Sequence, residues 1–211
     1  MSNKLYIVGA GGFAREIYSY LSETNYEFGG YILSGFLDDN LSALDGYKLK
    51  HKVDMRLLTE DISIGSKLIM AIANPSLKER VFKYYKNIGL EFLTYIHNTA
   101  FVGQRVCLGE GTIVGPKSVI TADVDVGKCV TINALSSIGH NAIIGDYSTL
   151  SGHCDVTGFV QLGARVFMGS HALIIPSVQI GDGAIIGAGS VVISRVKPGL
   201  TMFGNPARKV K

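Results

Sequence analysis

From Ile96 to Val192, every sixth residue of the chain is apolar, without an exception. The series comprises Ile96, Val102, Leu108, Val114, Ile120, Val126, Ile132, Ile138, Ile144, Leu150, Val156, Leu162, Met168, Ile174, Ile180, Ile186 and Val192. Since 47% of the chain is hydrophobic, this run has a chance probability on the order of one in a million. A helix repeats near 3.6 residues and a strand near 2, so neither alone explains a strict period of six.

The period predicts a triangular solenoid in which each six-residue repeat, or hexad, forms one flat strand with its apolar residue inward. Three hexads form a coil of about eighteen residues, and successive coils stack roughly 4.8 Å apart. A small side chain such as Thr112, Ser118 or Ala184 stands two residues before each apolar one. Gly follows the apolar residue in ten of the seventeen hexads, and we expect these glycines to adopt corner conformations that a Cβ disfavours. The register is unbroken, so we expect a solenoid over residues 94–211 with no long loop.

Residues 1–93 are expected to form a separate small domain with a Rossmann-like α/β fold. A buried strand over residues 4–8 precedes Gly9, Ala10, Gly11 and Gly12, and a helix is expected from about Arg15 to Leu21. This G-x-G-x-x-A spacing between strand and helix is typical of a turn that holds a phosphate group, because its glycines allow close approach and the helix N-terminus offers free amides. The alternative is that these glycines only shape the turn.

Further strands are expected over residues 31–37, 67–73 and 92–95, with a helix over 76–86. The first of them ends in Asp38 and Asp39, whose carboxylates could accept hydrogen bonds from a ribose or a base. The pattern predicts a small parallel sheet with ligands at its carboxyl edge. A nicotinamide dehydrogenase is disfavoured, because the domain has fewer than a hundred residues and the solenoid offers no hydride-transfer site.

Composition excludes several classes of partner. The net charge of +3 does not favour binding to nucleic acid or to a membrane surface. The three cysteines, Cys107, Cys129 and Cys154, form no CxxC pair, so we expect reduced, buried thiols. The first apolar run is too short for a signal peptide and no segment has the length of a membrane span, which predicts a cytoplasmic protein.

Histidine is the usual base near neutral pH, so the five histidines are the candidates for proton transfer. His51 lies in a polar stretch and is expected at the surface, and His97 starts the first coil. His140 stands two places after an inward residue and should project from the solenoid. His153 and His171 are one coil apart and should stack, with a structural or groove-lining role. No third ligand recurs at their spacing, so no metal site is expected.

The chain resembles the bacterial sugar acetyltransferases of the hexapeptide-repeat superfamily, which place a small nucleotide-binding domain before a left-handed β-helix. They include enzymes that N-acetylate nucleotide-linked 4-amino sugars and the sialic acid O-acetyltransferase relatives. The resemblance rests on the hexads and on these segments: Gly9-Ala10-Gly11-Gly12, Phe36-Leu37-Asp38-Asp39, Ile72-Ala73-Asn74, Gly139-His140-Asn141, and Phe203-Gly204-Asn205-Pro206-Ala207-Arg208.

The resemblance implies a homotrimer that transfers an acetyl group from acetyl-CoA to a sugar, most simply a nucleotide-linked 4-amino-4,6-dideoxy sugar for surface glycan synthesis. It implies that His140 is the general base, with Asn141 and Asn133 beside it. The residues implied to line the acetyl-CoA groove between neighbouring prisms are Gly158, Ser170 and Ala188, with Arg208 near the CoA phosphates. Those implied to bind the nucleotide sugar are Gly9, Gly11, Gly12, Asp38, Asp39, Ala73 and Asn74.

Many relatives have Asp or Glu after the histidine, where this chain has Asn141. An amide oxygen can fix the tautomer of the ring but gives less electrostatic help to its protonated form. Three alternatives stay open on the sequence: sugar O-acetylation, a non-catalytic scaffold or sugar-binding solenoid, and a β-helical carbonic anhydrase. The last is disfavoured because no two of His140, His153 and His171 share a hexad.

Overall fold

The computed structural model describes residues 3–210. The chain divides into two compact units. The front unit contains the residues up to Ala73 together with Leu77–Leu93, and the second unit contains Asn74–Ser76 and the chain from Thr94 onward. Each unit has its own sheet system and is described separately.

The front unit is an α/β domain built on a mixed sheet with the strand order β2-β3-β1-β5-β6, in which β4 also pairs with β3. Its elements are β1 (Lys4–Val8), α1 (Gly12–Ser22), β2 (Glu27–Phe28), β3 (Tyr31–Leu37), β4 (Val53–Met55), β5 (Lys67–Met70), α2 (Pro75–Asn87) and β6 (Glu91–Phe92). Strands β3 and β5 pair in parallel with opposite sides of β1. The carboxyl ends of β1, β3 and β5 therefore meet at one edge of the sheet, and this is where a Rossmann-like fold binds ligands.

The sequence predicted the strands at residues 4–8 and 31–37 with their correct bounds, but several other expectations for this unit were wrong. The sheet is not wholly parallel, because β2 pairs antiparallel with β3. Strands β2 and β4 were missed, since two or three residues are too few for a periodic signal. The expected strand over 92–95 is two strands: Glu91–Phe92 closes this sheet, whereas Tyr95–Ile96 is the first strand of the solenoid.

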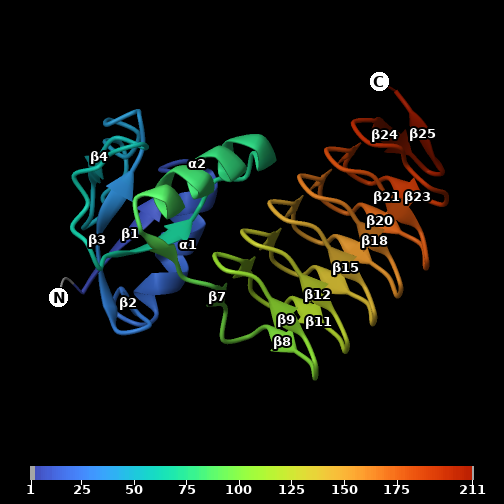
Figure 1. Ribbon diagram of the computed structural model, residues 1–211, viewed down its shortest axis with the longest axis horizontal. Coiled ribbons are helices and arrows are strands. Elements are labelled where there is room, and N and C mark those ends of the chain that lie inside the picture. Colours follow the sequence, from blue (N-terminus) through green and yellow to red (C-terminus); the bar gives the residue numbers. More distant parts are fainter. Residues whose placement is uncertain (1–2, 211) are drawn as a thin grey trace. The chain divides into compact units, whose positions relative to one another are not determined.

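The second unit is a parallel β-helix, as the period of six predicted. Figure 1 shows its short strands as successive rungs of a three-sided prism. Each strand pairs in parallel with the strand eighteen residues later, for example Ser137 with Asp155 and Ile143 with Gln161. The described part of the second unit has seventeen two-residue strands: β7 (Tyr95–Ile96), β8 (Phe101–Val102), β9 (Cys107–Leu108), β10 (Ile113–Val114), β11 (Val119–Ile120), β12 (Asp125–Val126), β13 (Thr131–Ile132), β14 (Ser137–Ile138), β15 (Ile143–Ile144), β16 (Thr149–Leu150), β17 (Asp155–Val156), β18 (Gln161–Leu162), β19 (Phe167–Met168), β20 (Leu173–Ile174), β21 (Gln179–Ile180), β22 (Ile185–Ile186) and β23 (Val191–Val192).

Three sheets form the sides of the prism, and each takes every third strand. Their orders are β25-β24-β22-β19-β16-β13-β10-β7, β23-β20-β17-β14-β11-β8 and β21-β18-β15-β12-β9. The first sheet ends in an antiparallel pair formed by β24 (Thr201–Gly204) and β25 (Ala207–Lys209).

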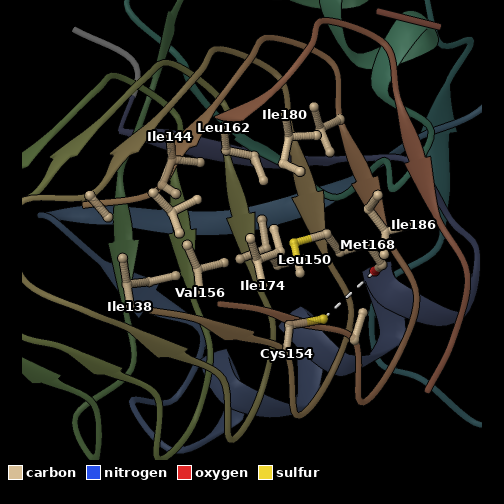
Figure 2. Close-up of a cluster of buried hydrophobic side chains, with 14 of the residues drawn as sticks. Ile138, Ile144, Leu150, Cys154, Val156, Leu162, Met168, Ile174, Ile180 and Ile186 are labelled. Atoms are coloured by element: carbon tan, nitrogen blue, oxygen red, sulfur yellow. Dashed lines mark hydrogen bonds between the residues drawn. The ribbon is translucent and has the colours of Figure 1, made fainter. Parts of the chain in front are cut away.

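The inward residues of the hexads stack into aliphatic ladders that fill the prism. In Figure 2, Ile138, Val156 and Ile174 form one such row. All of the inward residues from Val114 to Val192 are buried. Those of the first coil, Ile96, Val102 and Leu108, are not.

The small residues that stand two places before the inward ones lie inside the corners. They fit the limited space there, and some of them also form hydrogen bonds. At Thr94, Thr112, Ser118, Ser136 and Ser148, the hydroxyl donates a hydrogen bond to a main-chain carbonyl fifteen residues later. Thr112 bonds to Gly127 O at 2.8 Å, and Ser148 bonds to Gly163 O at 3.0 Å. These buried hydroxyls thus satisfy main-chain acceptors at the corners.

The expected reason for the hexad glycines was wrong. Glycines such as Gly109 and Gly115 do not have positive φ. They are needed for space, because a Cβ on Gly115 would lie 2.8 Å from the amide nitrogen of Ala134 in the next coil. The left-handed corner position falls two residues later, and there non-glycine residues such as Asn141 (φ 58°) and His153 (φ 60°) occupy it.

Two further features bear on function. The cysteines were expected to be buried, but only Cys129 and Cys154 are, and Cys107 is exposed because it points outward from β9. Within residues 3–210, neither helix has the length and apolar composition that crossing a bilayer requires.

Candidate functional site

The glycine-rich turn lies between β1 and α1, where the carboxyl ends of the three parallel strands meet. The amide of Gly9 donates to Leu37 O of β3 at 2.8 Å, and the amide of Ala71 donates to Val8 O at 2.9 Å. Gly9 has φ +104°, and a Cβ there would lie 3.0 Å from Ala71 O. Gly9 is therefore required by the fold of the turn itself.

Gly11 and Gly12 have a different role, because neither is crowded. A Cβ on Gly11 would meet nothing within 4 Å, and one on Gly12 would meet only the guanidinium of Arg15, at 3.9 Å. Gly11 is the N-cap of α1, with no side-chain cap and no acidic residue in the first turn. The exposed main chain and the positive end of the helix together suit an anion such as a phosphate.

The carboxylate of Asp38 holds this turn in place. One of its oxygens accepts a hydrogen bond from the amide of Ala10 at 2.7 Å, and the other accepts one from the amide of Asn40 at 2.9 Å. Asp39 accepts a longer bond, 3.3 Å, from the amide of Leu57. Both carboxylates were expected to contact a nucleotide, and the structure gives each of them at least one main-chain partner as well. Asp39 is the more exposed of the two.

Ala73 and Asn74 follow β5 and are exposed.

Sequence reasoning missed one further residue near the glycines, Arg15. Its guanidinium lies 4.1 Å from the ring centroid of Tyr47. An arginine held over an aromatic ring beside Gly12 adds a fixed positive charge where a phosphate would approach. Its signal in the sequence was a basic residue in the first turn of a helix that follows a glycine-rich turn.

His51 was expected to have a solvated surface role, and this was wrong. Its Nδ1 lies 3.3 Å from the hydroxyl oxygen of Tyr18, and its ring packs edge-on against Tyr26 with centroids 5.0 Å apart. Burial, with a smaller contribution from the nearby Lys50, lowers the pKa of His51.

The second unit carries its functional candidates at the corners of the prism. The corner between the six-stranded and five-stranded sheets, here named the His140 corner, contains residues 104–105, 122–123, 140–141 and 158–159. The corner between the eight-stranded and six-stranded sheets, the His153 corner, contains residues 134–135, 152–153, 170–171 and 188–189. Hydrogen bonds fix the stacking within each corner: the amide of Asn141 donates to Ala122 O at 3.2 Å, and that of Phe159 donates to His140 O at 2.9 Å.

His140 is exposed and projects from the turn after β14. Its Nδ1 lies 3.0 Å from Oδ1 of Asn141. If Nδ1 carries the proton and donates to this amide oxygen, Nε2 keeps a free lone pair, as a general base requires. The left-handed conformation of Asn141 makes this contact between adjacent residues possible, and Asn adopts that conformation more readily than most residues.

The next coil forms the other wall around the imidazole. A Cβ on Gly158 would lie 2.9 Å from Nε2 of His140, so the ring can take its position only because this residue is glycine. The ring of Phe159 meets the imidazole edge-on, with centroids 5.1 Å apart and planes at 90°. Together these contacts hold the ring in one orientation.

The preceding coil contributes a charged pair. The carboxylate of Asp123 accepts hydrogen bonds from Nε of Arg105 and, at 2.8 Å, from its Nη2. The hydrogen bond from Arg105 is the main cause that lowers the pKa of Asp123, and the charge of His140 contributes in the same direction. Sequence reasoning did not include Asp123, although its place eighteen residues before Asn141 was a readable signal.

The other expected residues lie elsewhere on the prism. Asn133 precedes β14 and His140 follows it, so within one chain the two are at opposite ends of this strand. The side-chain oxygen of Asn133 accepts a bond from the amide of Ala134 at 2.7 Å. Of the residues expected to line an acetyl-CoA groove, Gly158 lies at the His140 corner, whereas Ser170 and Ala188 are exposed at the His153 corner.

Arg208 is exposed in β25, opposite Phe203 of β24.

His153 and His171 stack as the spacing predicted, with ring centroids 4.5 Å apart and planes at 13°. Lone pairs in the planes of parallel rings do not converge on one ion. Within residues 3–210, no three His, Cys, Asp or Glu side chains are grouped as metal ligands.

With this geometry established, comparison with known proteins identifies the family. The chain is 30% identical, over 97% of its length and 95% of the relative's, to GDP-perosamine N-acetyltransferase of Escherichia coli O157:H7. The profile of the PglD N-terminal domain matches residues 4–85, and that of the bacterial transferase hexapeptide (six repeats) matches residues 159–194. The chain belongs to the hexapeptide-repeat acetyltransferases.

Solved structures of hexapeptide-repeat acetyltransferases have the same fold over nearly the whole chain. PerB from Caulobacter crescentus, solved in complex with CoA and GDP-perosamine, superposes with a TM-score of 0.85 at 28% identity and covers 99% of this chain and 97% of its own. WeeI from Acinetobacter baumannii AYE superposes with a TM-score of 0.86 at 27% identity, covering 98% and 99%. The resemblance drawn from the sequence is therefore confirmed, including the acetyltransferase class.

Proposed function

We propose that the protein transfers the acetyl group of acetyl-CoA to the amino group of a nucleotide-linked 4-amino-4,6-dideoxy sugar, with His140 as the general base. One observation carries this proposal. His140 projects from the prism with Nδ1 held by Asn141 at 3.0 Å, which leaves Nε2 available to a substrate. The likeness to a GDP-perosamine N-acetyltransferase along almost the full chain supports the substrate class.

The transfer needs four bond changes. The sugar amine attacks the thioester carbonyl carbon while Nε2 of His140 takes its proton, and an oxyanion forms on the former carbonyl oxygen. The carbonyl then re-forms, the carbon–sulfur bond breaks, and the CoA thiolate takes the proton from the imidazolium. Asn141 keeps the ring oriented through both proton transfers. General base catalysis of this kind contributes roughly 10²- to 10⁴-fold to the rate.

The front unit is proposed to bind the nucleotide. Gly9, Gly11 and Gly12 would present main chain to the diphosphate at the start of α1, and Arg15 would add positive charge. Asp39, with Ala73, would face the nucleoside, and Asp38 would both hold the turn and lie next to the ligand. The open space above Gly11 supports this arrangement.

The active protein is proposed to be a homotrimer, with acetyl-CoA bound along Gly158, Ser170, Ala188 and Arg208 at the seam between subunits. Within one chain Gly158 lies at the His140 corner, whereas Ser170 and Ala188 lie at the His153 corner, and a seam formed by two chains would bring such corners together. It would likewise bring Asn133 of one subunit to His140 of another.

Outward apolar residues support burial of these surfaces in an assembly: Phe101 on β8 is 61% exposed, Leu135 at the His153 corner 48%, and Phe159 at the His140 corner 54%. Dependence on acetyl-CoA supports a cytoplasmic location.

The test is the acetylation of GDP-perosamine by acetyl-CoA, followed by chromatography of the acetylated product, with UDP- and dTDP-linked 4-amino-4,6-dideoxy sugars compared in parallel. We expect His140→Ala to lower kcat by about 10²-fold or more while keeping the wild-type melting temperature. A wild-type rate in His140→Ala would refute the role of His140. No acetylation of any of the three sugars would refute the substrate class.

A further inference from the structure

The proposed reaction places a positive charge on His140, and the residue that follows the histidine does not compensate it. Asn141 fixes the tautomer through its amide oxygen but carries no charge. A carboxylate close to a transient imidazolium stabilises it, because a nearby negative charge favours the protonated form of a histidine. The structure supplies a carboxylate from another coil.

That carboxylate is Asp123, which occupies the position of Asn141 one coil earlier in the His140 corner. Both residues have the left-handed conformation, with φ of 60° and 58°. The amide of Asn141 donates to Ala122 O at 3.2 Å, so the main chain before Asp123 lies directly against the turn that carries His140. The stacking of coils, not proximity in sequence, places the turn that carries Asp123 against the turn that carries His140.

Arg105 fixes the orientation of the Asp123 carboxylate. It lies one further coil away, where the amide of Asp123 donates to Gln104 O at 3.1 Å. Its guanidinium grips both carboxylate oxygens of Asp123 in a forked arrangement. The corner thus presents a fixed sequence of cation, anion and imidazole over three successive coils, with the anion between the other two. A bidentate pair of this kind limits the rotation of the carboxylate.

We propose that Asp123, held by Arg105, is a positioning residue that stabilises the protonated form of His140 during acetyl transfer. The inference rests on the proposed function of His140. It assigns to Asp123 the charge that an acidic residue directly after the histidine would otherwise supply. In this chain the tautomer-fixing contact and the charge are divided between two coils.

Other charged groups near this corner come from the flanking strands. Asp125 points outward from β12, and Asp155 points outward from β17, where it accepts a hydrogen bond from the hydroxyl of Ser137. Neither belongs to the corner stack. On the coil that follows His140, the corner residues Gly158 and Phe159 carry no charge, so the carboxylate of the stack comes from Asp123 alone.

The decisive experiment compares two variants that break the same ion pair from opposite sides. In Asp123→Asn the imidazole loses a stabilising anion, so we expect kcat/KM for GDP-perosamine to fall on the order of tenfold, with its acid limb moved to lower pH. In Arg105→Gln the anion stays without its cation, and we expect the acid limb to move to higher pH. A purely structural ion pair would move both profiles in the same direction or not at all, and either result overturns the proposal.

A double variant that moves the carboxylate tests the role of its charge by rescue. Introducing Asn141→Asp into the Asp123→Asn background restores a carboxylate beside the ring, so we expect both the rate and the acid limb to return toward wild type. No recovery in the double variant, with a wild-type melting temperature, would count against Asp123 acting through its charge. The control is Asp182→Asn, which removes a looser Asp–Arg pair with Arg165, 3.5 Å apart, away from the His140 corner. We expect it to keep the wild-type pH profile.

His140→Ala separates the two possible failures. If that variant is inactive while Asp123→Asn matches Asp182→Asn in rate and pH profile, only the inference about Asp123 is wrong. If His140→Ala is as active as wild type, the proposed function fails first.

Discussion

Nε2 of His140 faces the α-carbon of Gly158, its counterpart one coil later, so closely that a Cβ on Gly158 would lie 2.9 Å away. The two residues are eighteen apart, and the hydrogen bond from the amide of Phe159 to His140 O holds their coils together. The imidazole can therefore occupy this position because Gly158 has no Cβ.

Gly158→Ala is expected to displace the ring and lower kcat roughly tenfold to a hundredfold, because misplacing a catalytic group by about 1 Å can cost that much. Stability should change little, since the ring is exposed and can rotate away. Steady-state kinetics with GDP-perosamine and a melting curve check this. The matched control is Gly152→Ala, whose Cβ would have its nearest neighbour at an ordinary 3.4 Å. Equal kcat in both variants would contradict the prediction.

Gly109→Ala should destabilise the protein without touching the site. Its Cβ would lie 2.5 Å from the carbonyl carbon of Gly127, a main-chain atom that cannot move aside alone. We expect a loss of about 1–3 kcal/mol in the free energy of unfolding, as for an overpacked core. Urea denaturation measures it. Ser151→Ala, at the same hexad position, should cost far less, and a similar loss there would show that space at Gly109 is not the cause.

Asp38→Ala removes the acceptor for the amide of Ala10, a charge-assisted bond of 2.7 Å. We expect the front unit to lose about 1.5–3 kcal/mol of stability and the amide of Ala10 to exchange its hydrogen faster. Asp38→Asn, which keeps a neutral acceptor, should lose less. Hydrogen exchange resolved at Ala10 measures both variants. Unchanged protection in Asp38→Ala would show that Asp38 does not hold the turn.

The stability of the front unit should fall with acidity partly through His51. Its pKa is lowered by burial, and next by Lys50, so the unfolded chain binds a proton at a higher pH than the folded one. This contribution is fully present above the unfolded pKa near 6.5 and is lost as pH falls below it. The melting temperature of His51→Gln should therefore drop less between pH 7.5 and pH 5.5 than that of wild type. An equal drop would rule out this contribution.

The solenoid could be read from the sequence because its register has no insertion. The series of inward residues from Ile96 to Val192 sufficed to locate strands β7 to β23, and it placed His140 outward and stacked His153 on His171. The glycines were located correctly but explained wrongly, since crowding by the next coil is a relation between residues eighteen apart that a local reading does not weigh.

The front unit was harder to read for the opposite reason. Strands β2 and β4 have two and three residues, and their pairing with β3 depends on the sheet and not on any pattern of their own. The role of Asp38 in holding Ala10 depends on where β3 ends relative to β1. His51 reads as polar surface until Tyr18 and Tyr26 are seen to pack around it.

The unbroken six-residue register also limits how such a chain can change in length. Loss of one hexad after the site would turn everything behind it by one side of the triangle, which would carry Arg208 and the terminal hairpin to a different corner. Loss of three hexads would shorten the prism by one coil and leave each remaining residue on the same side of the prism as before. Viable length variants of this half should therefore differ by multiples of eighteen.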